Sequence, residues 1–219
     1  MLFSRTIIIS CAGMGNRLGL GTTKALVEVE GKPLIVRQLE LLDKEKDIRI
    51  VVGYQAEQVV EVVRKYRQDI LFVFNHNYRK TGTGASVALA SKYANPYILA
   101  LDGDILIHPE DIEKVLTCRT EFVSGDMIKS EEPWMIQTYQ DLSGEYVSAF
   151  SKEKGNYEWN GIAQMESYKM QKGTGHVFQQ IEPYLPIPFL KVRTQEIDTI
   201  FDYEHAVQWV RNGFDKEKK

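Results

Sequence analysis

The sequence predicts an α/β protein with a mostly parallel mixed sheet flanked by helices. Through residues 6–116, short β-branched runs alternate with segments that place apolar side chains at helical spacing, which is typical of βαβ units. After residue 120 the pattern changes to period-2 segments at 134–139 and 145–150, separated by the turn sequence DLSG. We therefore expect a small antiparallel β insertion at one edge of the sheet.

The expected elements follow one another closely along the chain. In the first half we expect strands at 6–10, 48–54, 69–75 and 95–101, helices at 34–42, 56–66 and 109–116, and a helix that begins at 86. In the second half we expect strands at 158–165 and 188–193, a helix at 175–185, and a last helix from near Asp202 to Gly213. A chain of 219 residues without repeats or a long linker fits a single domain.

Composition narrows the class of protein. The net charge of −3 gives no support to a broad nucleic-acid-binding face. No stretch approaches the roughly 20 apolar residues needed to cross a bilayer. The two cysteines, Cys11 and Cys118, lack paired spacing, which suits a reducing compartment. We expect a cytoplasmic protein that binds neither nucleic acid nor a membrane surface.

Three of the four expected parallel strands end in a loop rich in glycine or aspartate. The first loop carries Gly13 and Gly15, the second carries Gly82, and the third carries Asp102 and Asp104. Ligands of such sheets bind outside the carboxyl ends of the strands, so these loops are expected to meet at one site.

The loop at 13–24 has the composition of a phosphate cradle. Its glycines let backbone N–H groups approach a phosphate closely, and Arg17 and Lys24 add positive charge. The alternative is a flexible turn with two solvated cations.

These motifs together resemble a known family. Residues 13–18 (GMGNRL), 24–27 (KALV) and 31–35 (GKPLI) resemble the opening signature of the nucleotidyltransferases that make activated sugars and alcohols. Residues 82–85 (GTGA) look like the family's base-binding segment, 101–104 (LDGD) like its metal-binding strand end, and 196–199 (EIDT) like its late Asp motif. One departure is Thr23, which stands where the family usually has proline before its lysine.

The resemblance implies a Rossmann-like fold and a single nucleotidyltransferase domain over residues 1–219. Residues 1–119 would form the nucleotide-binding half and 120–219 the acceptor-binding half. The implied partners are a nucleoside triphosphate and a small phosphorylated acceptor, and a homodimer is compatible with the resemblance.

The implied reaction is attack of an acceptor phosphate oxygen on the α-phosphorus of the nucleoside triphosphate, with release of pyrophosphate. Arg17, Lys24 and Lys152 would neutralise charge on the phosphates. Mg²⁺ would be held by Asp104 and Asp198. The remaining nucleotide-binding candidates are Ala12, Gly13, Gly15, Asn16, Gly53, Asn75, Gly82 and Asp102.

Both proposed metal ligands have structural alternatives. Asp104 precedes a helix and could be its N-cap. Asp198 could also be a cap, although Asp202 fits that role better. Asn75 could read a pyrimidine edge or could be a turn residue after its strand.

The acceptor candidates are Trp134, Trp159 and Glu158. Aromatic faces beside a carboxylate could hold an amine or quaternary ammonium, although the same aromatics could simply pack the hairpin onto the sheet. The later motifs look most like the compact cytidylyltransferases for phosphocholine and similar phosphoalcohols or phosphonates, which use CTP and feed surface-glycan or lipid decoration. The alternatives are a sugar-1-phosphate nucleotidyltransferase using UTP, GTP or dTTP, and a nucleotide-binding regulatory module without turnover.

Overall fold

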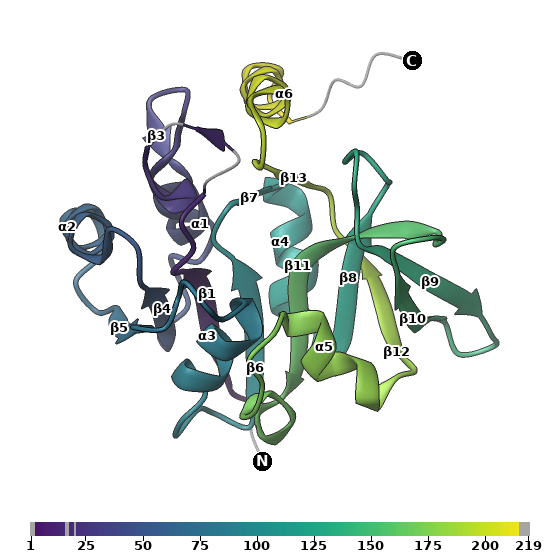
Figure 1. The fold of residues 1–219 in the computed structure, drawn as a ribbon. Helices are drawn as coiled ribbons and strands as arrows, with labels where there is room; N and C mark the ends of the chain where they lie inside the picture. Colours follow the sequence, from purple (N-terminus) through teal and green to yellow (C-terminus); the bar gives the residue numbers. More distant parts are fainter. Residues whose placement is uncertain (1–2, 16–17, 20, 215–219) are drawn as a thin grey trace.

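The structure is a computed structural model that describes residues 3–15, 18–19 and 21–214. Within these residues a nine-stranded sheet runs in the order β5-β4-β1-β6-β11-β8-β12-β10-β9 (Figure 1). Pairing is parallel through the first four strands of this order and between β8 and β12, and antiparallel elsewhere. The expected α/β class and mixed sheet are confirmed.

The parallel part of the sheet comes from the first half of the chain. Its strands are β1 (Arg5–Cys11), β4 (Ile48–Val52), β5 (Leu71–Phe74) and β6 (Tyr97–Asp102). The helices between and after them are α1 (Leu34–Leu41), α2 (Ala56–Tyr66), α3 (Thr83–Ala90) and α4 (Pro109–Thr117). All four expected strands and all four helices are present, with ends that differ by a few residues.

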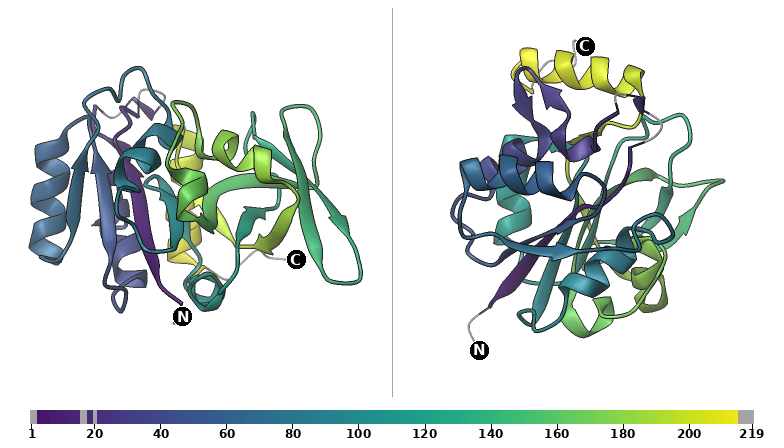
Figure 2. Two further views of the ribbon diagram at one scale, coloured as in Figure 1. Left: turned by 90° about the horizontal axis from the view of Figure 1, so that it is seen from below. Right: turned by 60° about the vertical axis from the view of Figure 1, so that its left-hand side comes forward.

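The second half extends the sheet with mainly antiparallel strands. They are β8 (Phe122–Asp126), β9 (Met135–Gln140), β10 (Glu145–Ser151), β11 (Tyr157–Glu166) and β12 (Ile187–Lys191). The predicted hairpin is β9–β10, which projects from the end of the sheet opposite α2 (Figure 2). The helices here are α5 (Val177–Ile181) and α6 (Ile200–Arg211).

Two small two-stranded sheets lie beside the main one. In the first, β7 (Ile105–Ile107) pairs antiparallel with β13 (Thr194–Glu196). In the second, β2 (Glu28–Val29) pairs with β3 (Lys32–Pro33). The first of these pairings matters for the site, because it brings residues 194–198 beside the end of β6.

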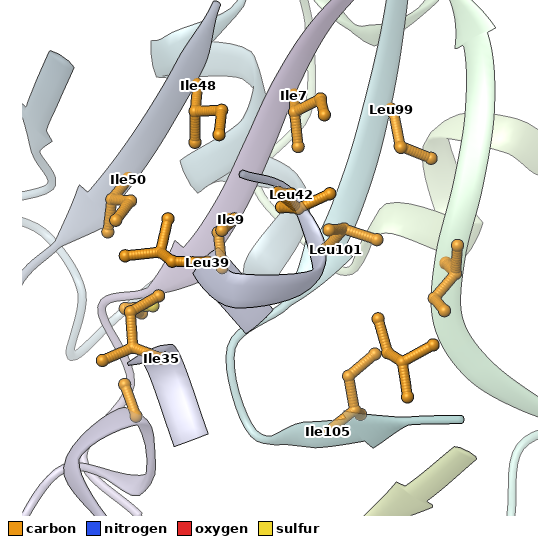
Figure 3. Close-up of a cluster of buried hydrophobic side chains, with 14 of the residues drawn as sticks. Ile7, Ile9, Ile35, Leu39, Leu42, Ile48, Ile50, Leu99, Leu101 and Ile105 are labelled. Atoms are coloured by element: carbon orange, nitrogen blue, oxygen red, sulfur yellow. The ribbon is translucent and has the colours of Figure 1, made fainter. Parts of the chain in front are cut away.

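The alternation of side chains along β1 supplies both layers of the core. Ile7 and Ile9 pack with residues of α1, α2 and α4 on one face of the sheet, as Figure 3 shows for Ile35 and Leu39. Ile8 packs with residues of α3 and α5 on the other face. Burying each of these isoleucines contributes about 2 kcal/mol, so the strand that leads into the glycine loop is firmly anchored.

The N-caps of two helices decide which of the alternative roles Asp104 and Asp198 can have. The N-cap of α4 is His108, whose side chain accepts a hydrogen bond from the Glu110 N–H, so Asp104 is not the cap. Helix α6 begins at Ile200 rather than near Asp202. Its N-cap is Thr199, and Asp202 completes a capping box from the third helical position. Asp198 is therefore left outside the cap.

A third apolar cluster holds α6 over the strand ends. It joins buried Val27, Val29 and Leu106 to Ala206 of the helix. Across the described part of the chain, the helices are too short or too polar to span a bilayer.

Candidate active site

The carboxyl ends of β1 and β6 lie side by side. Ser10 of β1 is in register with Asp102 of β6, so the loops after these strands start together. Gly53, after β4, packs against the same place: a Cβ atom there would lie 2.8 Å from the Ala12 carbonyl oxygen and 2.8 Å from Cβ of Tyr78. The backbones of Ala12 and Gly53 are thus closely packed next to the end of β1.

The glycine-rich loop leads to Lys24. Gly15 has φ of +62°, and a Cβ atom on it would lie 3.0 Å from Cγ of Lys24. Its missing side chain therefore leaves the path of the lysine open. The exposed Gly13 accepts a hydrogen bond of 3.2 Å from the Thr23 hydroxyl through its carbonyl oxygen. Asn16 and Arg17 lie outside the described residues, so their predicted roles stay predictions.

Lys24 brings together the two aspartates that the sequence singled out. Its Nζ atom lies 2.7 Å from Oδ2 of Asp104 and also pairs with Oδ1 of Asp198. The side chains of these three residues are 14%, 22% and 17% exposed, so two carboxylates share one ammonium group at the edge of the interior.

Glu196 joins this cluster and was missed by the sequence reasoning. One carboxylate oxygen from each of Asp104, Glu196 and Asp198 lies within 4.8 Å of the others. The β7–β13 pairing places Glu196 opposite Ile105, and the Ile197 N–H donates to the Asp104 carbonyl oxygen at 3.1 Å. A signal was available, because Glu196 stands two residues before Asp198 in the matched EIDT motif.

The three carboxylates fit a hard divalent cation. Mg²⁺ takes one or two protein carboxylates and completes its shell with phosphate oxygens and water. The donor set is all oxygen, which suits Mg²⁺ or Mn²⁺ and disfavours softer metals.

Asp102 lies close to this cluster and lines the same cleft as Glu196 and Asp198. Burial raises the pKa of its carboxyl group well above the ordinary value, and the negative charges of Asp104 and Glu196 raise the pKa further. Gly161 of β11 has φ of +77°, and a Cβ atom there would lie 2.8 Å from Cβ of Asp102. The turn that follows Asp102 is fixed from α1, since Nε2 of Gln38 donates to the carbonyl oxygens of Asp102 and Ile105 at 2.8 and 2.9 Å.

The Gly82 loop and Asn75 are engaged within the chain. The Gly82 N–H donates to the Thr174 carbonyl oxygen at 2.9 Å. Asn75 is 2% exposed, and its amide nitrogen donates to the hydroxyls of Thr81 and Ser86 at 3.1 and 3.2 Å. Both residues give the loop its shape, and base recognition by their side chains or N–H groups stays a prediction.

A cleft of about 570 Å³ opens beside the carboxylates. Asp102, Glu196 and Asp198 line one side of it. The other side is lined by the predicted catalytic residue Lys152 and the predicted acceptor residues Trp134, Glu158 and Trp159, together with His176 and Phe178. The structure therefore brings both predicted halves of the site to one cavity.

The aromatic side of the cleft is formed by rings that contact one another. The Trp134 and Phe178 ring centroids are 4.3 Å apart, and His176 lies nearly parallel to Phe178 at 5.7 Å. Nζ of Lys152 lies 5.0 Å from the Trp134 ring centroid and donates to the Glu132 carbonyl oxygen at 2.6 Å. A cation thus already lies over the face of Trp134.

Glu158 is held by the neighbouring loop. Its carboxylate accepts hydrogen bonds from the N–H groups of Lys129 and Ser130 at 2.8 and 3.1 Å, and from the Ser130 hydroxyl. The side chain lines the cleft, yet its oxygens are largely used by these donors. Its contacts make it a brace of the 127–133 loop.

The fold and the site define a class of protein that the comparisons identify. Residues 7–167 match the model of the MobA-like NTP transferase domain, and the chain belongs to this family. The family resemblance drawn from the sequence is therefore confirmed.

Particular relatives fall into two groups. The chain is 42% identical over 102 residues to the choline-phosphate cytidylyltransferase of Streptococcus pneumoniae, a match that covers 43% of each protein. It is 35% identical over 113 residues to the bifunctional protein GlmU of Aliarcobacter butzleri, covering 50% of this chain and 26% of that one. The aligned stretches thus span less than half of these curated relatives.

Solved structures show the same fold over almost the whole chain. The CTP:phosphocholine cytidylyltransferase LicC of S. pneumoniae superposes with a TM-score of 0.71 at 23% identity, covering 94% of this chain and all of that one. A putative glucose-1-phosphate thymidylyltransferase of Bacillus anthracis superposes with a TM-score of 0.78 at 15% identity, covering 95% and 96%.

Proposed function

We propose that the protein is a nucleotidyltransferase that transfers CMP from CTP to a small phosphorylated alcohol or phosphonate of the phosphocholine type, with release of pyrophosphate. The observation that carries the proposal is the pairing of Lys24 with Asp104 and with Asp198, which lines a cleft together with Lys152 and aromatic side chains. This arrangement suits a reaction between two phosphates of like charge.

The chemistry requires alignment and neutralisation of charge more than a general base. An acceptor phosphate is already an anion at neutral pH and can attack the α-phosphorus directly, so the barrier arises from repulsion and misalignment. Lys24 would leave its aspartate partners to neutralise negative charge at the α-phosphate. Lys152, on the other side of the cleft, would hold the acceptor phosphate. Arg17 would bind the β- and γ-phosphates.

Mg²⁺ bound by Asp104 and Asp198, with Glu196 beside them, would supply positive charge next to the triphosphate. Asp102 lines the cleft next to these carboxylates, and a cation bound there would favour the ionised form of its carboxyl group, because a nearby positive charge lowers the pKa of a carboxyl group.

Two observations favour an acceptor with a cationic group. The ring of Trp159 and the carboxylates Glu131 and Glu132 line the cleft, where Lys152 lies over the ring of Trp134. Of the two curated relatives described above, the choline-phosphate cytidylyltransferase has the higher sequence identity to this chain. A sugar-1-phosphate nucleotidyltransferase using UTP, GTP or dTTP is the second candidate, supported by the likeness to GlmU.

The test is a matrix of nucleotides against acceptors, read as pyrophosphate release. CTP, UTP, GTP and dTTP are each paired with phosphocholine, other phosphoalcohols, a phosphonate and several sugar 1-phosphates. We expect turnover with CTP and a phosphoalcohol or phosphonate, loss of turnover with a chelator, and recovery with Mg²⁺. Turnover only with sugar 1-phosphates and another nucleotide would establish the second candidate. Tight nucleotide binding without pyrophosphate release from any pair would indicate a regulatory module.

A further inference from the structure

The end of the glycine-rich loop is fastened to a side chain from another part of the chain. We propose that Gln55, just before α2, is a positioning residue that fixes Thr23 and thereby sets the place of Lys24. The role of Lys24 in this inference rests on the proposed function, whereas the fastening itself rests on the hydrogen bonds described next.

The Gln55 amide reaches three successive residues of the loop. Its Oε1 atom accepts hydrogen bonds from the Thr23 N–H at 2.8 Å and from the Thr22 hydroxyl at 3.2 Å. Its Nε2 atom donates to the Gly21 carbonyl oxygen at 3.0 Å. One uncharged primary amide thus pairs with both donors and acceptors of the loop.

Gln55 occupies a backbone conformation that L side chains rarely adopt. Its φ of 50° and ψ of 38° lie in the left-handed region that favours glycine. Strained backbone of this kind persists where the surrounding structure over-determines it. Glycine would relieve the strain, but it would also remove the amide that holds the loop.

Thr23 explains why the loop needs such a partner. Its φ of −63° and ψ of 142° are values that proline adopts without strain. Proline has no N–H group. Thr23 does have one, and because Thr23 is only 1% exposed, this N–H group requires an acceptor within the protein. Gln55 supplies that acceptor, and the Thr23 hydroxyl adds a bond to the Gly13 carbonyl oxygen. These two hydrogen bonds thus hold Thr23 near the φ value that the pyrrolidine ring would impose on a proline at this position.

Fixing Thr23 also fixes the residue that follows it. Thr23 is the N-cap of a short 3-10 turn over Lys24–Leu26, and its carbonyl oxygen accepts from the Leu26 N–H at 3.0 Å. The Lys24 backbone is therefore held between Thr23 and the buried Ala25. From this position the lysine side chain reaches Asp104 and Asp198.

The test is a double-mutant cycle between Gln55→Ala and Thr23→Pro. Gln55→Ala alone should lower the rate of pyrophosphate release about tenfold, since small misplacements of a catalytic group are costly, and leave the KM for the acceptor unchanged. Thr23→Pro alone should also slow the enzyme, because the proline ring would press on Oε1 of Gln55 where the N–H now donates. With both changes the rate should recover above that of Gln55→Ala, because proline needs no acceptor.

Three further variants and an exchange measurement make the result decisive. Gln55→Gly relieves the backbone strain and should unfold at a higher temperature than Gln55→Ala without recovering its rate, which separates positioning from stability. Gln58→Ala changes an exposed glutamine on the same helix and should match the unmodified protein. Hydrogen exchange at residues 21–24 should be faster in Gln55→Ala and unchanged in Gln58→Ala.

Two outcomes would overturn the inference: unchanged exchange at residues 21–24 in Gln55→Ala, or a Thr23→Pro effect on rate that is the same with and without Gln55. If the unmodified protein released no pyrophosphate from any nucleotide and acceptor, the proposed function would fail. The exchange rates would then still decide whether Gln55 holds the loop.

Discussion

The two walls of the cleft handle buried charge differently. At the ends of β1 and β6, the charged groups pair with one another through side chains, as Lys24 does with Asp104 and Asp198. On the β9–β11 side, the carboxylate of Glu158 is bound mainly by the backbone N–H groups of residues 129 and 130.

This difference separates two kinds of charged group: exchangeable charges, which can leave their partner for a ligand, and structural charges, which hold a loop in place. A side chain paired with another side chain can leave its partner for a ligand, because both long side chains can move. A carboxylate held by backbone N–H groups can leave only if the loop that carries them also moves. We therefore expect substitution of Lys24, Asp104 or Asp198 to affect turnover, and substitution of Glu158 to affect stability.

The largest effect is expected for Lys24→Met. Loss of the ammonium group removes positive charge from the place where the α-phosphate would lie, and removing one such group typically lowers turnover by about 10²–10³-fold. The protein should stay folded because the cluster lies at the edge of the cleft and is partly exposed. Pyrophosphate release and a thermal melt measure the two quantities.

The matched control for this change is Lys44→Met. Lys44 is exposed in the connection after α1, and its loss should leave turnover unchanged. If Lys24→Met kept more than a third of the turnover, the exchangeable charge would not be catalytic.

A smaller effect, now on stability, is expected for Glu158→Ala. The change removes the charged acceptor of the Lys129 and Ser130 N–H groups, whose hydrogen bonds to it are partly buried. Hydrogen bonds to a charged group contribute about 1.5–3 kcal/mol to the free energy of unfolding. Denaturant titration measures that loss.

Acceptor selectivity decides between the two roles of Glu158. If Glu158 only supports the loop, Glu158→Ala should change the KM for cationic and neutral acceptors by the same factor. A rise in KM for cationic acceptors alone would support the acceptor-binding interpretation. Glu153→Gln, an exposed glutamate beyond the cleft, should change neither KM nor stability.

Much of the first wall could be predicted because parallel strand ends meet at one edge. Lys24, Asp104 and Asp198 were named from motifs and lie together. Glu196 was missed because its place depends on the three-residue pairing of β7 and β13, and strands that short leave almost no pattern in the sequence. The consequence of Thr23 was equally hidden, since its partner Gln55 lies 32 residues further along the chain.

The second wall was predicted at the level of elements and less well at the level of side chains. The hairpin and strands follow from alternation and turn residues. Whether a residue on them faces a ligand or a neighbouring loop depends on tertiary contacts. Trp134 and Glu158 both line the cleft, yet one packs on Phe178 and the other is bound by the 129–130 backbone.

The smallest effect is expected for an ion pair outside the cleft. As in the Lys24 cluster, charged side chains there pair with one another. Asp111 of α4 is 1% exposed and accepts hydrogen bonds from Nε and Nη2 of Arg193 at 2.8 and 3.0 Å and from Nζ of Lys114 at 2.6 Å. Burial alone would raise the pKa of this carboxyl group, but the bonds to Arg193 and Lys114 lower it below its usual range. The pair joins the two halves of the chain without facing a ligand.

Because the pKa of Asp111 is lower in the folded state than in the unfolded one, its contribution to stability is present at neutral pH and is lost as the pH falls below about 4. We expect Asp111→Asn to lower the free energy of unfolding by about 1–2 kcal/mol at pH 7 and to leave turnover unchanged. The difference from the unmodified protein should shrink as denaturant titrations are repeated from pH 5 towards pH 3. Glu113→Gln, exposed on the same helix, should show no such pH dependence. A loss of turnover without a loss of stability in Asp111→Asn would contradict this expectation. It would mean that paired charged side chains affect turnover even when they lie away from the cleft.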